Sequence, residues 1–114
     1  MTNHAELTSE RWRQFSLDQQ ILMIGNEMSR ASQQMSREDL ERRQASYERV
    51  LRLVDLTIEV QKSRGLRREL LLWREVIAGL YLSGEADADT HRIAFKLLLQ
   101  LTPVAAQQVQ YLDL

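Results

Sequence analysis

The 114-residue sequence contains no cysteine, a single proline and only four glycines. The absence of cysteine excludes disulfides, thiolate zinc sites and cysteine nucleophiles. Every apolar run is far shorter than the roughly 20 residues of a membrane-spanning helix, and the opening residues MTNHAELTSERWR contain no apolar stretch of a secretory signal. We therefore expect a cytoplasmic protein that makes no contact with a membrane.

The chain also has little net charge, since 15 basic residues are set against 16 acidic ones for a formal charge of −1. Dedicated nucleic-acid-binding domains usually carry a basic excess, so the composition argues against that class but leaves room for a local basic patch. The content of 44% hydrophobic and 27% charged residues is ordinary for a globular domain. We expect one domain over residues 1–114, with residues 1–8 as a flexible tail.

Helical periodicity dominates the sequence. No stretch alternates apolar and polar residues for long enough to predict a strand, whereas apolar residues recur every three or four positions. The sequence therefore predicts an all-α, up-and-down bundle of four main helices, with short extra helices at the N- and C-terminal ends. The expected main helices span about 17–35, 37–63, 66–82 and 90–102, and the short ones 9–15 and 104–112.

Residues that cap helices predict where these elements begin and end. Ser16 opens a capping-box pattern at the start of the first main helix. Ser36 is the expected N-cap of the second helix, and Gly65 is its expected C-terminal stop. Asp89 or Thr90 is expected to cap the fourth helix.

The third predicted helix contains LRRELLLWREV at residues 66–76 and is apolar around most of its surface. On a helical wheel, one stripe contains Leu66, Leu70, Trp73, Ile77 and Leu80, and a second stripe contains Leu72 and Val76. Such a helix is either wrapped by its neighbours or packed against another subunit. We predict self-association, and because tryptophan is enriched at interface hot spots, we expect a contact surface made of Trp73, Ile77, Leu80 and Tyr81.

Glu69 falls between these two apolar stripes. A buried carboxylate is costly unless it is paired, so we favour a structural ion pair with an arginine or a capping role in the first helical turn. The alternative is a catalytic or binding carboxylate inside the bundle. Di-metal bundle sites need a Glu-x-x-His pattern, which the sequence lacks, so this alternative is disfavoured.

The segment KSRGLRR, residues 62–68, holds four cations that we call the basic corner: Lys62, Arg64, Arg67 and Arg68. Cations around a glycine turn are suited to binding phosphate groups. The alternative, which the near-neutral charge of the whole chain favours, is a solvated connection between helices. In that case Lys62 and Arg64 stabilise the C-terminus of the preceding helix.

The segment GEADADTH, residues 84–91, contains the carboxylates of Glu85, Asp87 and Asp89, which we call the acidic loop. Calcium loops use alternate carboxylates, but the glycine and the distal glutamate of that pattern are missing. His91 has no second histidine at ligand spacing. We therefore predict no metal site and no cofactor, and we interpret the loop as an acidic lead-in to a helix N-terminus.

Residues 50–82 resemble a group of small uncharacterised bacterial all-helical proteins, through the segments DLTI, REL and REV at 55–58, 68–70 and 74–76. More distantly, the layout resembles four-helix proteins encoded by intervening sequences of ribosomal RNA genes and the accessory variability determinant of retroelements. Those resemblances imply a bundle that assembles into a ring and, in the retroelement case, binds nucleic acid. They also suggest a polar pairing between Asp55 and one of three residues, namely Arg68, Glu69 or Arg74.

Three functions are compatible with these patterns. The leading one is a non-enzymatic, self-associating protein-interaction module whose partner is a second copy or another protein. The second is a nucleic-acid-binding accessory protein that uses the basic corner. The third is an enzyme with a carboxylate site near Glu69, and it is the least supported because no nucleophile, metal cluster or cofactor motif accompanies that residue.

Overall fold

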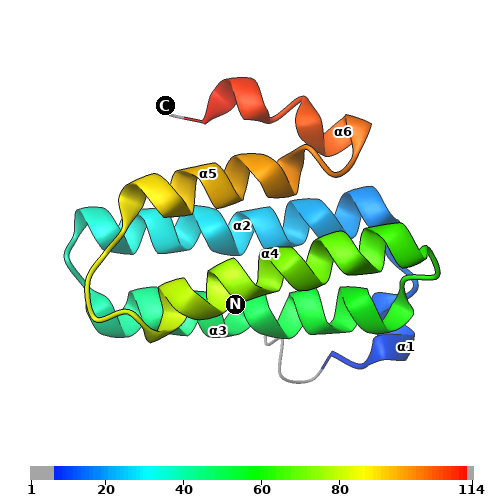
Figure 1. Ribbon diagram of the computed structural model, residues 1–114, viewed down its shortest axis with the longest axis horizontal. Helices are drawn as coiled ribbons and strands as arrows, with labels where there is room; N and C mark the ends of the chain where they lie inside the picture. The colour runs from blue at the N-terminus through cyan, green and yellow to red at the C-terminus, as the bar shows by residue number, and fades with distance from the viewer. Residues whose placement is uncertain (1–6, 113–114) are drawn as a thin grey trace.

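The computed structural model describes residues 7–112 and contains helices but no strand within that range (Figure 1). The four main helices are α2 (Leu17–Ser36), α3 (Leu40–Val60), α4 (Arg64–Leu82) and α5 (Ala88–Leu99). Three short elements flank them: α1 (Ser9–Trp12), α6 (Pro103–Ala106) and the 3₁₀ turn Val109–Tyr111. The predicted all-α bundle with short terminal helices is thereby confirmed.

The main helices form an up-and-down bundle in which each helix packs against the next, and α5 closes the ring by packing against α2 (Figure 1). Gly25 of α2 lies at this contact, and a Cβ atom there would be 3.4 Å from the ring of Phe95 on α5, an ordinary van der Waals distance. Short helices cover the outside of the ring, with α1 against α3 and α6 against α2. None of the helices found within residues 7–112 is long and apolar enough to cross a membrane.

The core contains one large aliphatic and aromatic cluster contributed by all four main helices, by α1 and by Ala105 of α6. Trp12 of α1 is completely buried, and its indole Nε1 donates a 2.9 Å hydrogen bond to Thr57 of α3. The side chain of Gln20 donates to the carbonyl of Trp12 over 2.9 Å. Although α1 has only four residues, these contacts fix it as part of the bundle.

The connection between α2 and α3 differs from the prediction. Ser36 is the last residue of α2 rather than the N-cap of the next helix, and Asp39 caps α3 by accepting from the backbone N–H of Arg42. Between them, Glu38 adopts a left-handed φ of 55°. The backbone N–H of Glu38 donates to Met35 and that of Asp39 donates to Gln34, which is the Schellman arrangement that ends a helix.

Two further predicted boundaries are corrected. Gly65 does not stop α3; it lies in the first turn of α4, which Ser63 caps by accepting from the N–H of Leu66. The N-cap of α5 is Asp87, whose carboxylate accepts from both the N–H and the hydroxyl of Thr90. In each case several residues able to cap lie close together, and the packing of the bundle selects one of them.

The tail predicted over residues 1–8 lies mostly outside the described residues. Its last two residues are ordered parts of the fold. Leu7 packs on the hydrophobic core and its carbonyl accepts a 3.0 Å hydrogen bond from Arg52. Thr8 caps α1 through its hydroxyl, which accepts from the N–H of Arg11.

Candidate functional site

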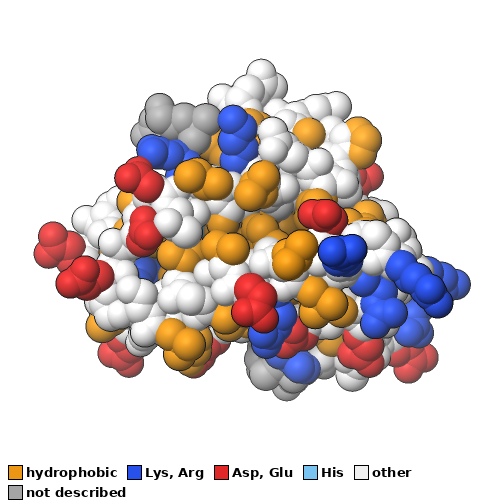
Figure 2. Space-filling view, in the orientation of Figure 1, with side chains coloured by type: hydrophobic (Ala, Val, Ile, Leu, Met, Phe, Trp, Pro, Cys, Tyr) orange, Lys and Arg blue, Asp and Glu red, His pale blue; other side chains and the backbone are white. Residues whose placement is uncertain are grey.

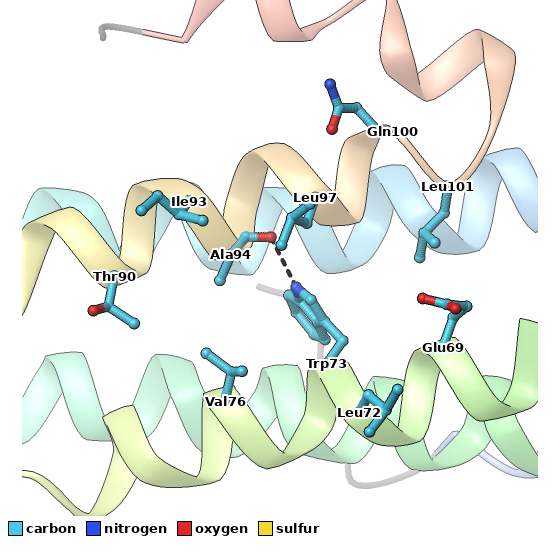
Figure 3. A pocket seen from close by; sticks show the side chains of 10 residues that line it. All are labelled: Glu69, Leu72, Trp73, Val76, Thr90, Ile93, Ala94, Leu97, Gln100 and Leu101. Atoms are coloured by element: carbon cyan, nitrogen blue, oxygen red, sulfur yellow. Dashed lines mark hydrogen bonds between the residues drawn. The ribbon is translucent and has the colours of Figure 1, made fainter.

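An open groove of about 520 Å³ runs along the surface between α4 and α5 (Figure 3). We call it the apolar groove, and it is lined by Glu69, Leu72, Trp73, Val76, Thr90, Ile93, Ala94, Leu97, Gln100 and Leu101. Glu69 and Leu101 lie at one end of it and Thr90 lies at the other (Figure 3). Seven of the ten side chains are hydrocarbon or aromatic, so the groove is suited to an apolar partner.

Four of these apolar side chains face solvent. Their exposed fractions are 58% for Leu72, 42% for Val76, 61% for Ile93 and 54% for Leu97. Figure 2 shows apolar side chains gathered across the middle of this face of the molecule. Single exposed apolar residues are common on protein surfaces, whereas contiguous exposed apolar patches are typical of binding surfaces, which makes this face the candidate site.

Trp73 forms the floor of the groove. Its side chain is buried, and its indole Nε1 donates a 2.8 Å hydrogen bond to the backbone carbonyl of Ala94, joining α4 to α5 (Figure 3). The carbonyl of Ala94 lies inside α5, so this bond holds the two helices side by side at a single level. On the solvent side of Trp73, the Leu, Val and Ile side chains of α4 and α5 lie apart from one another and leave the groove open.

The predicted contact residues lie deeper than expected. Trp73, Ile77 and Leu80 are buried in the core of the chain itself, so they do not form its exposed surface. Tyr81 is half-buried, and its hydroxyl donates a 2.6 Å hydrogen bond to Glu48, which raises the pKa of the phenol. The exposed large apolar side chains of α4 are instead Leu71, Leu72, Val76 and Leu82, and of these Leu72 and Val76 form the second stripe of the helical wheel, which lines the groove.

Ile93 and Leu97, which form the α5 half of the groove, were not among the predicted contact residues. Ile93 and Leu97 are four residues apart, which places them on one face of a helix. That spacing was visible, but it does not say whether the shared face is buried. In the structure His91, Phe95 and Leu98 take the core positions of α5, and the Ile93–Leu97 face is left exposed.

Glu69 is exposed at the end of the groove. It has neither of the two structural roles predicted for it, which were an ion pair with an arginine and a cap in the first helical turn. It lies beyond the first turn of α4, so it does not cap the helix. Within residues 7–112 its carboxylate forms no ion pair, and neither does Arg68. Because water solvates Glu69, it carries none of the cost of a buried carboxylate.

Of the three pairings suggested for Asp55, the structure contains the one with Arg74. The guanidinium donates from Nε to Oδ1 over 2.6 Å and from Nη2 to Oδ2 over 3.3 Å. The hydrogen bonds to Asp55 raise the pKa of Arg74. This bidentate ion pair joins α3 to α4 on the outside of the bundle, away from the residues that line the groove.

The basic corner lies where α3 passes into α4. Lys62, Arg64, Arg67 and Arg68 are all exposed, and no ion pair in the described part of the chain involves any of them. Arg64 was expected to stabilise the C-terminus of the preceding helix, but it is the first residue of α4. Arg64 and Arg67 lie in the first turn of α4, at the positive end of its dipole, so helix stability does not explain these two cations.

The acidic loop leads into α5 at the opposite end of α4. Hydrogen bonds from Thr90 lower the pKa of Asp87, the N-cap of α5. Asp89 forms a 2.9 Å ion pair with Arg92 one turn later. Across residues 7–112, no group of three or more histidine or acidic residues is arranged to hold a metal ion.

Two buried polar clusters escaped sequence analysis. Glu27 of α2 is 1% exposed and accepts from Arg30 over 2.6 Å and from Arg49 of α3 over 2.8 Å. His91 of α5 is also buried, and its ring bonds to Tyr47 of α3 and to the carbonyl of Met28 on α2. These clusters cross-link helices inside the bundle, and the partners on other helices, Arg49, Tyr47 and Met28, are too distant in sequence for local patterns to reveal them.

No protein-family model, curated protein or solved structure matches this chain. The resemblances drawn from residues 50–82 therefore stay predictions. The features of this chain that bear on its function are the apolar groove and the charges at its two ends.

Proposed function

We propose that the protein is a non-enzymatic interaction module of the bacterial cytoplasm that self-associates through its apolar groove. One observation carries this proposal: Leu72, Val76, Ile93 and Leu97 line a single open groove and are each about half exposed. A second copy presents an identical groove and is always present wherever the protein is made. Burying an identical patch on each copy is how twofold homodimers form.

The energetics favour such a contact. Completing the burial of a half-exposed aliphatic side chain contributes roughly 1 kcal/mol. Four such side chains on each copy contribute several times that amount, which is the scale needed to offset the entropy lost on association. The exposed charged residues of the basic corner and the acidic loop supply the polar rim that protein interfaces usually have.

The chemistry of the groove favours binding over catalysis. Glu69 is the only titratable residue in its lining. A lone solvated carboxylate supplies neither an acid–base pair nor a nucleophile with its base. Asp55, the other carboxylate considered for a catalytic role, is bound to Arg74 and does not line the groove.

The test is the molar mass of the purified protein, measured by light scattering after size-exclusion chromatography over a range of concentrations. We expect a mass of a dimer or larger assembly of the 13.4 kDa chain. Leu97→Glu should give a folded monomer, since it places a charge in the groove at an already exposed position. The matched control is Val104→Glu on α6, where a similarly exposed residue lies outside the groove. A wild-type monomer at every concentration contradicts the proposal.

Nucleic-acid binding is the second candidate, and the basic corner is the observation that favours it. Four exposed cations surround the N-terminus of α4 and form no ion pair with any residue between 7 and 112, and such positions suit phosphate groups. Fluorescence anisotropy with labelled duplex and single-stranded oligonucleotides at low salt tests this. Binding that disappears on changing Arg64, Arg67 and Arg68 to alanine supports it, and no binding by the wild type contradicts it.

A further inference from the structure

The two ends of the α4–α5 face carry opposite charge. The basic corner lies at the N-terminal end of α4, and the acidic loop lies at its C-terminal end and runs into α5. All seven of these charged residues are exposed. In the orientation of Figure 2, Lys and Arg side chains gather at the right end of the molecule and Asp and Glu side chains at the left end.

These charges are only partly neutralised within the chain. As described above, the basic corner forms no ion pair with any residue of the range 7–112. In the acidic loop, Asp89 pairs with Arg92, whereas the carboxylate of Glu85 accepts no hydrogen bond from the described residues. The face therefore has an excess of positive charge at one end and of negative charge at the other.

Symmetry limits how two such faces can meet. When identical faces pack about a twofold axis, the axis lies in the plane of the interface. If the axis runs along α4 and α5, each end of the face meets its own copy, so cations oppose cations. If the axis runs across the two helices, the basic end of each copy meets the acidic end of the other. Only the second arrangement places opposite charges together, and like-charge contacts are strongly disfavoured at interfaces.

We infer that the apolar groove is occupied by the groove of a second copy of this chain, with the helices of the two copies antiparallel across the interface. The inference rests on the proposed self-association. In this dimer the exposed aliphatic side chains of the grooves form the centre of the contact. The basic corner of each protomer lies over the acidic loop of its partner, so the same charge contact occurs twice. The charges set the orientation of the dimer, and the apolar side chains supply most of its affinity.

Charge reversal at the two ends tests the orientation. The first variant, Arg64→Glu with Arg67→Glu, makes both ends of the face acidic. The second, Glu85→Arg with Asp89→Arg, makes both ends basic and leaves Asp87, the N-cap of α5, intact. The dimerisation constant of each is measured by sedimentation equilibrium. We expect each variant alone to dimerise about tenfold more weakly than the wild type or worse, because exposed ion pairs are lost at both ends.

The decisive measurement is the mixture. An equimolar mixture of the two variants should form a heterodimer, since an all-acidic face then meets an all-basic one. A single chain carrying all four substitutions should dimerise about as well as the wild type, because its ends are again opposite. The matched control, Arg11→Glu with Arg13→Glu, changes the net charge equally on exposed residues of α1 and its cap and should leave the dimer unchanged.

The outcomes separate this inference from the proposed function. A heterodimer in the mixture together with weakened homodimers supports the antiparallel arrangement. Homodimers of undiminished affinity in both variants overturn the arrangement but leave self-association in place. A wild-type chain that is monomeric at all concentrations overturns both.

Discussion

The phenol of Tyr47 and the imidazole of His91 form a buried hydrogen bond of 2.7 Å that joins α3 to α5. On its other side, Nε2 of His91 lies 3.0 Å from the backbone carbonyl of Met28 on α2. Because a carbonyl can only accept, Nε2 carries the ring proton, so in the neutral ring Nδ1 accepts from the Tyr47 hydroxyl. One neutral histidine thus ties three helices together.

Burial lowers the pKa of His91 from 6.5 to about 4. Between these two values the unfolded chain binds a proton that the folded chain does not, so unfolding becomes easier as the pH falls. The contribution of His91 is fully present above pH 6.5 and is lost as the pH falls from about 6.5 to about 4. The shift corresponds to a loss on the order of 3 kcal/mol in the free energy of unfolding.

Urea denaturation of the wild type and of His91→Gln at pH values from 7.5 to about 4 measures this effect. Gln takes up no proton in this range. The free energy of unfolding of the His91→Gln variant should therefore fall less steeply than that of the wild type as the pH decreases. The carboxylates titrate in both proteins and cancel in the comparison. Parallel pH profiles for the two proteins would contradict a buried, neutral His91.

The ion pair between Glu27 and Arg49 links α2 to α3 in the interior. Replacing Arg49 by methionine keeps much of its packing but removes a charged hydrogen bond from a carboxylate that is almost completely buried. We expect the free energy of unfolding to fall by about 1.5–3 kcal/mol. The measurement is chemical denaturation at neutral pH.

Arg42→Met is the control for that experiment. Arg42 forms an ion pair with Asp39, but both side chains face solvent, so the loss should be about 0.5 kcal/mol or less. Equal losses in the two variants would show that the burial of Glu27 does not strengthen its ion pair.

The pairing of Asp55 with Arg74 leads to a smaller prediction. Both side chains are partly exposed, so Asp55→Ala should lower the free energy of unfolding by only about 0.2–1 kcal/mol. Glu69→Ala should lower it less still, because Glu69 forms no ion pair within residues 7–112. Thermal melting of both variants checks this, and a larger loss in Glu69→Ala would require a structural role for that carboxylate.

Local patterns were sufficient to predict the number of main helices and some of their ends. The capping box of Ser16 and Gln19 is present as predicted, because both hydrogen bonds form within four residues. The start of α3 could not be predicted in the same way. Ser36 and Asp39 both cap helices well, and the choice between them depends on how far α2 extends along its neighbours.

Which side of α4 would line the groove could not be predicted from local patterns either. A helical wheel separates the stripe of Leu72 and Val76 from the stripe of Trp73, but both stripes are apolar. Which one faces the core depends on where α3 and α5 lie, and that is a property of the assembled bundle. The buried contact of Tyr47 with His91, 44 positions away in the sequence, depends on the fold in the same way.

The left-handed residue between α2 and α3 supports a last prediction. Glu38 has a φ of 55° at the position where helices ending in a Schellman motif usually have glycine. A side chain there costs roughly 1–2 kcal/mol of conformational strain, and part of that cost is offset because glycine makes the unfolded chain more flexible. Glu38→Gly should therefore raise the free energy of unfolding by about 1 kcal/mol. Glu41→Gly, at a helical position in the first turn of α3, is the control and should lower the free energy by about 0.5–1 kcal/mol. If both substitutions destabilise the protein equally in chemical denaturation, the backbone at position 38 is not strained.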